Sequence, residues 1–218
     1  MSSPVKPSPG YKTILRIVAP NSLLKEYDIY LRLGRKAGGA YVRFKIFDML
    51  SLAGSQPAVP KTSRSFLFVC FGNIMRSPMA EALFRKELGS LADEPSLRIA
   101  SAGLHATPGN PAHPWALASS PEFGISLEQH RAQLLTAEMV QEANAIFVMD
   151  FQNKAELVTL YPDSGHKVFM LGACLTNSGQ REIPDPYFGN VEATRNCYRI
   201  LQACVRNLTS DLFPHSNR

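Results

Sequence analysis

The sequence contains no run of about 18 to 20 uninterrupted apolar residues, the length that a membrane-spanning helix needs. Its first ten residues, MSSPVKPSPG, hold no charged segment that leads into an apolar one, so no signal peptide is expected. These two absences predict a cytoplasmic protein without a membrane span.

Cysteine is also scarce. The four cysteines are Cys70, Cys174, Cys197 and Cys204, and none of them forms a C-x-x-C pair or a zinc-binding spacing. In a reducing compartment such residues are free thiols. The sequence therefore predicts no metal site and no cofactor.

Positive charge is concentrated in one part of the chain. Residues 1–60 contain nine Lys or Arg and three acidic residues, a net charge of +6, which leaves −1 for the rest of the 218 residues. The segment AGSQPAVPKTSRS, residues 53–65, has the small, polar and proline-rich composition of a linker. We therefore expect a basic N-terminal extension over residues 1–60 and one globular domain over residues 61–218.

The extension has an amphipathic pattern from Asn21 onward, which predicts two short helices separated at Gly38 and Gly39. Such a segment can pack against the domain, bind a partner protein or lie on an anionic membrane surface. We favour packing or a partner protein, with peripheral membrane contact as the alternative. Nucleic acid is not expected, because the basic residues are not interleaved with stacking aromatic residues.

After the linker, short apolar runs alternate with helical patterns. The expected strands span residues 66–69, 97–101, 145–150 and 167–171, and the expected helices span residues 78–88, 136–143, 151–160 and 191–208. This alternation predicts an α/β fold, a doubly wound four-stranded parallel sheet with helices on both faces, preceded by the helical extension. Ligands of such folds bind beyond the carboxyl ends of the strands, where Cys70 is expected.

The stretch FVCFGNIMRSPMAEALF contains a C-x5-R motif between a strand and a helix. Gly72 and Asn73 tolerate positive φ, so the amides of this loop can turn toward a common centre and bind a phosphate. Ser77 and Pro78 predict the start of the helix, with Ser77 as its N-cap. Arg76 can hold two phosphate oxygens at once.

The same positive environment is expected to act on the Cys70 thiol. A cysteine beside an arginine and above a helix N-terminus can have a pKa of about 3.5 to 7.5, so it is largely a thiolate at neutral pH. Cys70 is thus a candidate nucleophile for attack on a bound phosphorus atom.

Such an attack needs an acid to protonate the departing oxygen. Asp185 is the candidate, because Pro184 and Pro186 restrict the backbone of an otherwise flexible loop around it. Tyr187 and Phe188 follow it and can form an aromatic wall. The combination favours an aryl phosphate as substrate.

Together with SAG at 101–103, HRA at 130–132, MD at 149–150 and DPY at 185–187, this stretch closely resembles the low-molecular-weight protein tyrosine phosphatases. The resemblance covers residues 64 to about 213. It implies the flavodoxin-like phosphatase fold and hydrolysis of phosphotyrosine through a phosphocysteine intermediate. Two positions differ from many relatives: Met75 stands where they have a second loop cysteine, and Phe188 where they have a tyrosine.

The resemblance also implies a role for each site residue. Cys70 would be the nucleophile, Arg76 the phosphate clamp and Asp185 the general acid. The residues expected to bind phosphate or substrate are Phe71, Gly72, Asn73, Ile74, Met75, Ser77 and Tyr187. Ser101 and His130 would support the loop through hydrogen bonds.

The expected partner is a phosphotyrosine-bearing protein, with a tyrosine kinase among the candidates. Two alternatives are an arsenate reductase of the same fold and a phosphate-binding module without turnover. The reductase needs two further cysteines soon after the third strand, and DFQNKAELVTLYPDSGHKVFM contains none. The module does not account for the joint presence of Cys70, Arg76 and Asp185.

Overall fold

The computed structural model describes residues 21–50, 58–175 and 181–214. A four-stranded parallel sheet forms its centre, in the order β2-β1-β3-β4. The strands are β1 (Ser65–Cys70), β2 (Arg98–Gly103), β3 (Ala145–Val148) and β4 (Val168–Met170). The helices are α2 (Asn21–Met49), α3 (Arg76–Leu88), α4 (Pro114–Ser119), α5 (Ala137–Glu142), α6 (Phe151–Leu160) and α7 (Val191–Leu212).

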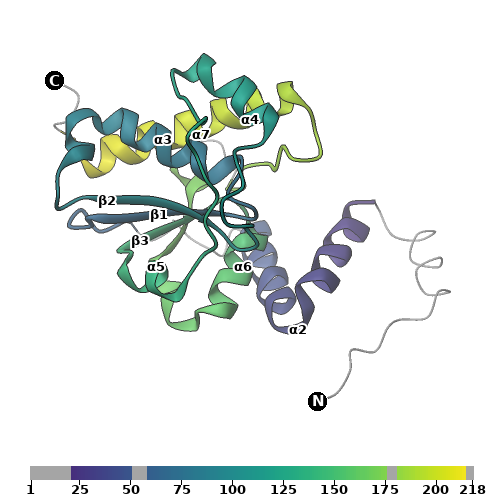
Figure 1. The fold of residues 1–218 in the computed structure, drawn as a ribbon. Helices are drawn as coiled ribbons and strands as arrows, with labels where there is room; N and C mark the ends of the chain where they lie inside the picture. Colours follow the sequence, from purple (N-terminus) through teal and green to yellow (C-terminus); the bar gives the residue numbers. More distant parts are fainter. Residues whose placement is uncertain (1–20, 51–57, 176–180, 215–218) are drawn as a thin grey trace.

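Helices cover both faces of the sheet, with α3, α4 and α7 on one face and α5 and α6 on the other (Figure 1). The alternating side chains of β1 supply the two cores. Phe66 and Phe68 pack under α3 and α7, whereas Leu67 and Val69 pack toward α5 and α6. Both faces of the strand are buried, as a parallel sheet between two helical layers requires. The predicted fold class is confirmed.

Helix α2 is kinked, but not where the sequence predicted. The break lies at Gly34, whose φ of 74° is outside the helical region, and the chain passes through Gly38 and Gly39 in helical conformation. A Cβ at Gly38 would lie 2.7 Å from the Tyr30 carbonyl oxygen, so this glycine allows the two halves of the helix to approach each other closely. The expectation of a break at Gly38 and Gly39 was therefore wrong.

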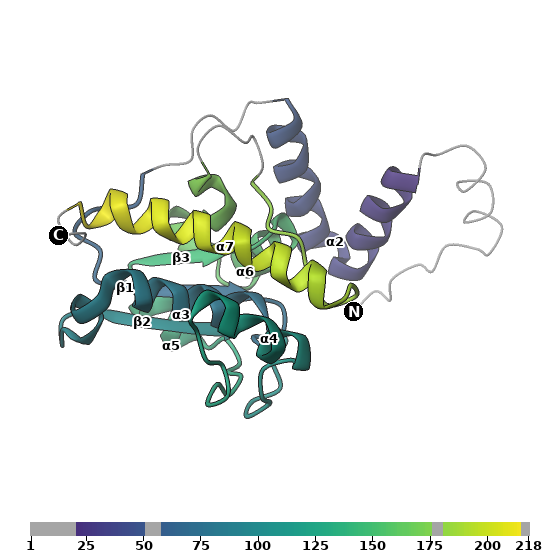
Figure 2. The ribbon, with the colours of Figure 1, turned by 90° about the horizontal axis from the view of Figure 1, so that it is seen from above.

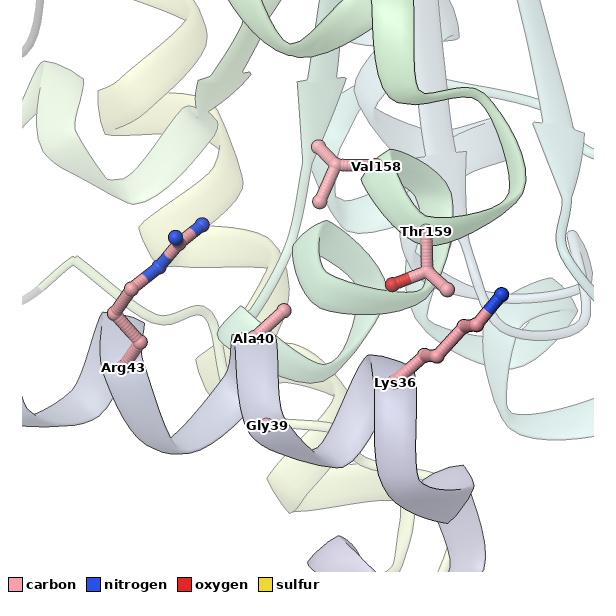
Figure 3. A pocket seen from close by; sticks show the side chains of 6 residues that line it. All are labelled: Lys36, Gly39, Ala40, Arg43, Val158 and Thr159. Atoms are coloured by element: carbon pink, nitrogen blue, oxygen red, sulfur yellow. The ribbon is translucent and has the colours of Figure 1, made fainter.

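The second half of α2 packs against α6, on the sheet face opposite α3 and α7 (Figures 1 and 2). Phe44 stacks on Phe151, with ring centroids 6.4 Å apart, and Lys154 lies 5.2 Å from the Phe44 ring. Lys36 and Arg43 of α2 flank a pocket of about 320 Å³, and α6 forms the opposite wall (Figure 3). Of the roles left open for the extension, packing against the domain is the one that the structure shows.

The other element boundaries shift by a few residues from those expected. Helix α3 begins at Arg76, with Met75 at its N-cap position, so Ser77 lies inside the first turn and is not the N-cap that the sequence predicted. Its hydroxyl is instead directed to the sulfur of Cys70.

Within the described residues, no helix has the length and apolar character needed to cross a membrane.

Candidate active site

The loop between β1 and α3 curls around the sulfur of Cys70. Cys70 is the last residue of β1 and is buried. Its Sγ accepts a hydrogen bond from the Asn73 N–H at 3.3 Å and lies 3.0 Å from the Ser77 hydroxyl. The Asn73 N–H and the Ser77 hydroxyl therefore both lie within hydrogen-bonding distance of the sulfur.

Asn73 holds this loop in shape. It is the only residue other than glycine with positive φ among the described residues, at 52°. Its buried side-chain amide donates to the hydroxyls of Ser77 at 2.8 Å and Ser101 at 3.0 Å. Its Oδ1 accepts from the Gln133 N–H at 2.8 Å. One side chain thus connects the loop to α3, to β2 and to the segment after His130.

His130 supports the loop from outside. Its Nε2 donates to the Asn73 carbonyl oxygen at 2.6 Å, since a carbonyl can only accept. Gly103 closes the loop from below, because a Cβ there would lie 2.8 Å from both the Asn73 nitrogen and the Phe71 carbonyl oxygen. The loop therefore packs backbone against backbone on the end of β2.

Arg76, the first residue of α3, is buried, with only 2% of its surface exposed. Its Nη1 donates to Asp150 at 2.7 Å and to the Ile183 carbonyl oxygen at 3.2 Å, and its Nη2 donates to Asp185 at 2.5 Å. Burial alone would lower the pKa of Arg76, but Asp150 and Asp185 outweigh that effect and raise the pKa above its ordinary value. Arg76 thus carries a permanent positive charge that also interacts electrostatically with Cys70.

Asp185 is brought to this charge by the loop before α7. Its Oδ2 bonds to Arg76, while its Oδ1 accepts from the Tyr187 N–H at 3.1 Å. The side chain is 41% exposed, in contrast to Arg76. Asp185 therefore lies where the buried site opens to solvent, with access to both a bound group and water.

Two exposed aromatic residues are close in sequence to the site residues. Phe71, 44% exposed, follows Cys70, and its ring is tilted against His105 with ring centroids 4.5 Å apart. Tyr187, 47% exposed, follows Asp185 by two residues and packs edge-on against His113 at 5.5 Å and against Phe188 at 5.1 Å. Both rings offer exposed aromatic surface near the site.

The remaining predicted residues contribute mainly backbone. Gly72 and Ile74 are partly buried in the loop, and the Ile74 carbonyl accepts from the His113 N–H at 2.9 Å. The Met75 side chain lies in the core under α3, and its carbonyl accepts from the Tyr198 hydroxyl at 3.3 Å. Met75 thus belongs to the loop through its main chain alone.

Sequence reasoning did not assign roles to Asp150, His105 and His113. Asp150 lies two residues after the end of β3, caps α6 by accepting from the Asn153 N–H at 2.7 Å and binds Arg76. A carboxylate at the carboxyl end of a parallel strand was the signal that could have identified it. Among the described residues, no cluster of three or more His, Cys, Asp or Glu side chains is placed to hold a metal ion.

Comparison with known proteins identifies the family of the chain. Residues 65–216 match the family described as low molecular weight phosphotyrosine protein phosphatase. The chain belongs to this family. The probable low molecular weight protein-tyrosine-phosphatase EpsP of Ralstonia nicotianae is 38% identical over 142 residues, which are 65% of this chain and 91% of that protein.

Solved structures of family members superpose on the same region. The crystal structure of the Erwinia amylovora tyrosine phosphatase AmsI has a TM-score of 0.63 and 34% identity, and the match covers 70% of this chain and 95% of that one. The YwlE arginine phosphatase from Geobacillus stearothermophilus has a TM-score of 0.61 and 30% identity, over 68% of this chain and 92% of that one. Helix α2 precedes the residues that match the phosphatase family.

The alternative of an arsenate reductase gains no support. Burial raises the pKa of Cys174 to about 11 and the pKa values of Cys197 and Cys204 to about 12. At neutral pH these side chains are thiols, which are poor nucleophiles for relaying a disulfide. Cys197 and Cys204 are also buried residues of α7 that face the core. The chain is a phosphatase of this family, and such phosphatases are hydrolases.

Proposed function

We propose that this phosphatase hydrolyses phosphotyrosine and related aryl phosphate monoesters through a phosphocysteine intermediate formed on Cys70. The observation that carries the proposal is the convergence of Cys70, Arg76 and Asp185 at one opening, with Arg76 in direct contact with Asp185. Nucleophile, phosphate clamp and acid are the three groups that this reaction needs.

In the first step, the Cys70 sulfur attacks phosphorus and forms an S–P bond while the bond between phosphorus and the phenolic oxygen breaks. Asp185, protonated, gives its proton to the departing oxygen, so that tyrosine leaves as a neutral phenol. The loop amides of residues 71–75 and the Arg76 guanidinium stabilise the charge on the phosphoryl oxygens. Asn73, Ser77, Ser101 and His130 hold the loop in the reactive shape.

In the second step, Asp185 is a carboxylate and accepts a proton from water. The water oxygen attacks phosphorus, the S–P bond breaks, and inorganic phosphate leaves with Cys70 again a thiolate. A phosphate oxygen clamped by Arg76 competes with Asp185 for Nη2, so substrate binding releases Asp185 toward the leaving group. The phosphate oxygen thus replaces the Asp185 carboxylate as the acceptor of Arg76 Nη2.

The aromatic surfaces of Phe71 and Tyr187 support a flat aryl group as the substrate, and we infer a phosphotyrosine-bearing protein, with a tyrosine kinase among the candidates. Residues 61–218 would form the catalytic domain and residues 1–60 its extension. A cytoplasmic location is part of the same proposal.

The test is turnover of p-nitrophenyl phosphate and of matched phosphotyrosine and phosphoarginine peptides. Wild type should prefer the phosphotyrosine peptide in kcat/KM, and Cys70→Ser should abolish turnover. Asp185→Asn should slow the first step by about 10² to 10⁴ while vanadate affinity stays near that of wild type. Activity that survives in Cys70→Ser would exclude the nucleophile, and a preference for phosphoarginine would overturn the substrate class.

A further inference from the structure

The segment just before Asp185 is anchored on several sides. The Ile183 N–H donates to the Met149 carbonyl oxygen at 2.8 Å, and the Ile183 carbonyl accepts from Arg76. Glu182 Oε1 accepts from the Phe151 N–H at 3.0 Å, at the start of α6. Residues 181–183 thus determine where the chain enters the loop that carries the proposed acid.

Helix α2 contacts this segment through two ion pairs. Lys45 Nζ lies 2.9 Å from Glu182 Oε2, and Asp48 Oδ1 lies 3.1 Å from Arg181 Nε. Lys45 and Asp48 are three residues apart and lie on one side of the helix. The positive and negative side chains of α2 therefore face side chains of opposite charge at the successive residues Glu182 and Arg181.

The two halves of α2 are themselves joined at this point. Glu26, before the kink, accepts a hydrogen bond from the Tyr41 hydroxyl and lies 3.5 Å from Lys45 Nζ. Burial and the neighbouring Glu26 raise the pKa of Tyr41 above its ordinary value, so the hydroxyl stays protonated and remains a donor. The ion-pair network therefore runs from the first half of α2 to the segment before Asp185.

We infer that Lys45 and Asp48 are positioning residues for the general acid, a role that rests on the proposed function of Asp185. They hold residues 181 and 182 against α2, and this limits the positions that Asp185 can take relative to Arg76. Helix α2 precedes the matched family residues, so in this chain a segment outside the family region restrains the acid loop.

The test uses the dependence of kcat/KM on the leaving group. Phenolate is more basic than p-nitrophenolate, so its departure depends more on a well-placed acid. Both ion pairs are partly exposed, and losing one of them should shift the equilibrium between the held and released positions of residues 181–182 by about two- to fivefold. We expect Lys45→Met and Asp48→Asn each to lower kcat/KM for phenyl phosphate by about this factor, with a change below about twofold for p-nitrophenyl phosphate and an unchanged vanadate inhibition constant.

The variant Glu182→Gln tests whether Lys45 acts through its ion pair with Glu182. Gln keeps an oxygen for the Phe151 N–H and loses the charge that pairs with Lys45. In the Glu182→Gln background, Lys45→Met should then have almost no further effect. Lys36→Met is the matched control, because Lys36 is an exposed cation of the same helix that borders the pocket on α6. Its kcat/KM should match wild type for both substrates, with far-UV circular dichroism and urea unfolding measured for every variant.

Three results would overturn the inference: equal losses for both substrates in Lys45→Met, the same losses in Lys36→Met, or a Lys45→Met effect that persists undiminished in the Glu182→Gln background. Asp185→Asn, measured in the same series, separates this inference from the proposed function. If Asp185→Asn shows the steep dependence on leaving group and Lys45→Met does not, the positioning role alone is wrong. If Asp185→Asn itself shows no such dependence, the role of the acid is wrong.

Discussion

Replacing Asn73 by alanine or glycine tests whether this residue maintains the shape of the phosphate loop. Both variants lose the three side-chain hydrogen bonds to Ser77, Ser101 and the Gln133 N–H. At about 0.5 to 1.5 kcal/mol each, their loss lowers the free energy of unfolding by roughly 1.5 to 4.5 kcal/mol. Against a typical total of about 5 to 15 kcal/mol, both variants should still fold.

The two variants differ in the backbone. A left-handed conformation such as the φ of 52° at Asn73 costs alanine about 1 to 2 kcal/mol but costs glycine almost nothing. Glycine loses about 0.5 to 1 kcal/mol more in chain entropy on folding. The balance favours Asn73→Gly over Asn73→Ala by up to about 1.5 kcal/mol, the reverse of the usual order.

Urea unfolding followed by circular dichroism, without phosphate or vanadate, measures the loss of stability in each variant and the difference between the two variants. The m-value should stay constant, so that the shift in midpoint reports stability. Turnover of p-nitrophenyl phosphate should fall in both variants, because the amide that donates to the Cys70 sulfur belongs to this residue. A loss below about 1 kcal/mol in both variants, or an alanine variant more stable than the glycine variant, would refute the reasoning.

Three further changes follow from the same contacts. Gly103→Ala places a Cβ 2.8 Å from two backbone atoms of the loop, so it should cost about 1 to 3 kcal/mol of stability and raise the inhibition constant of vanadate. Asp150→Asn keeps an acceptor for the Asn153 N–H but removes a charge from buried Arg76, so urea unfolding should show a loss of about 1 to 3 kcal/mol. Burial lowers the pKa of His113 in the folded protein, so the unfolded chain binds a proton at this residue more readily than the folded protein does. The folded state should therefore have its full stability above about pH 6.5, the ordinary pKa of histidine, and should lose stability as the pH falls below that value. Urea midpoints at pH 7.5 and 5.5 should show this loss in wild type and less of it in His113→Asn, where asparagine can still accept from the Trp115 N–H.

The fold and the position of the site could be predicted because they depend on local patterns. Apolar runs separated by amphipathic helices indicate a parallel sheet, and the C-x5-R spacing places its loop at the end of β1. The kink in α2 could not be located, because Gly34, Gly38 and Gly39 all interrupt the pattern. The structure has the kink at Gly34, whereas Gly38 is helical and lies against Tyr30.

The errors at the site have a common physical origin. Ser77 has the residue type and the position of an N-cap, but its hydroxyl pairs with the Cys70 sulfur, and the helix begins at Arg76. Asp150 binds Arg76 across 74 positions of sequence, a separation that no local pattern encodes. At Ser77 a tertiary partner overrode the local preference, and at Asp150 the tertiary partner lies beyond the reach of any local pattern.

The pairing of Arg76 with Asp185 links substrate binding to protonation in the proposed mechanism. A carboxylate on Nη2 and a phosphate oxygen compete for the same donor. Protonation of Asp185 removes its negative charge and weakens its bond to the guanidinium, which leaves Nη2 to the phosphate. The protonated form is also the form that can give a proton to the leaving oxygen. A phosphate dianion and the Asp185 carboxylate therefore exclude each other from Nη2 in the proposed mechanism, while Asp150 continues to pair with the buried guanidinium.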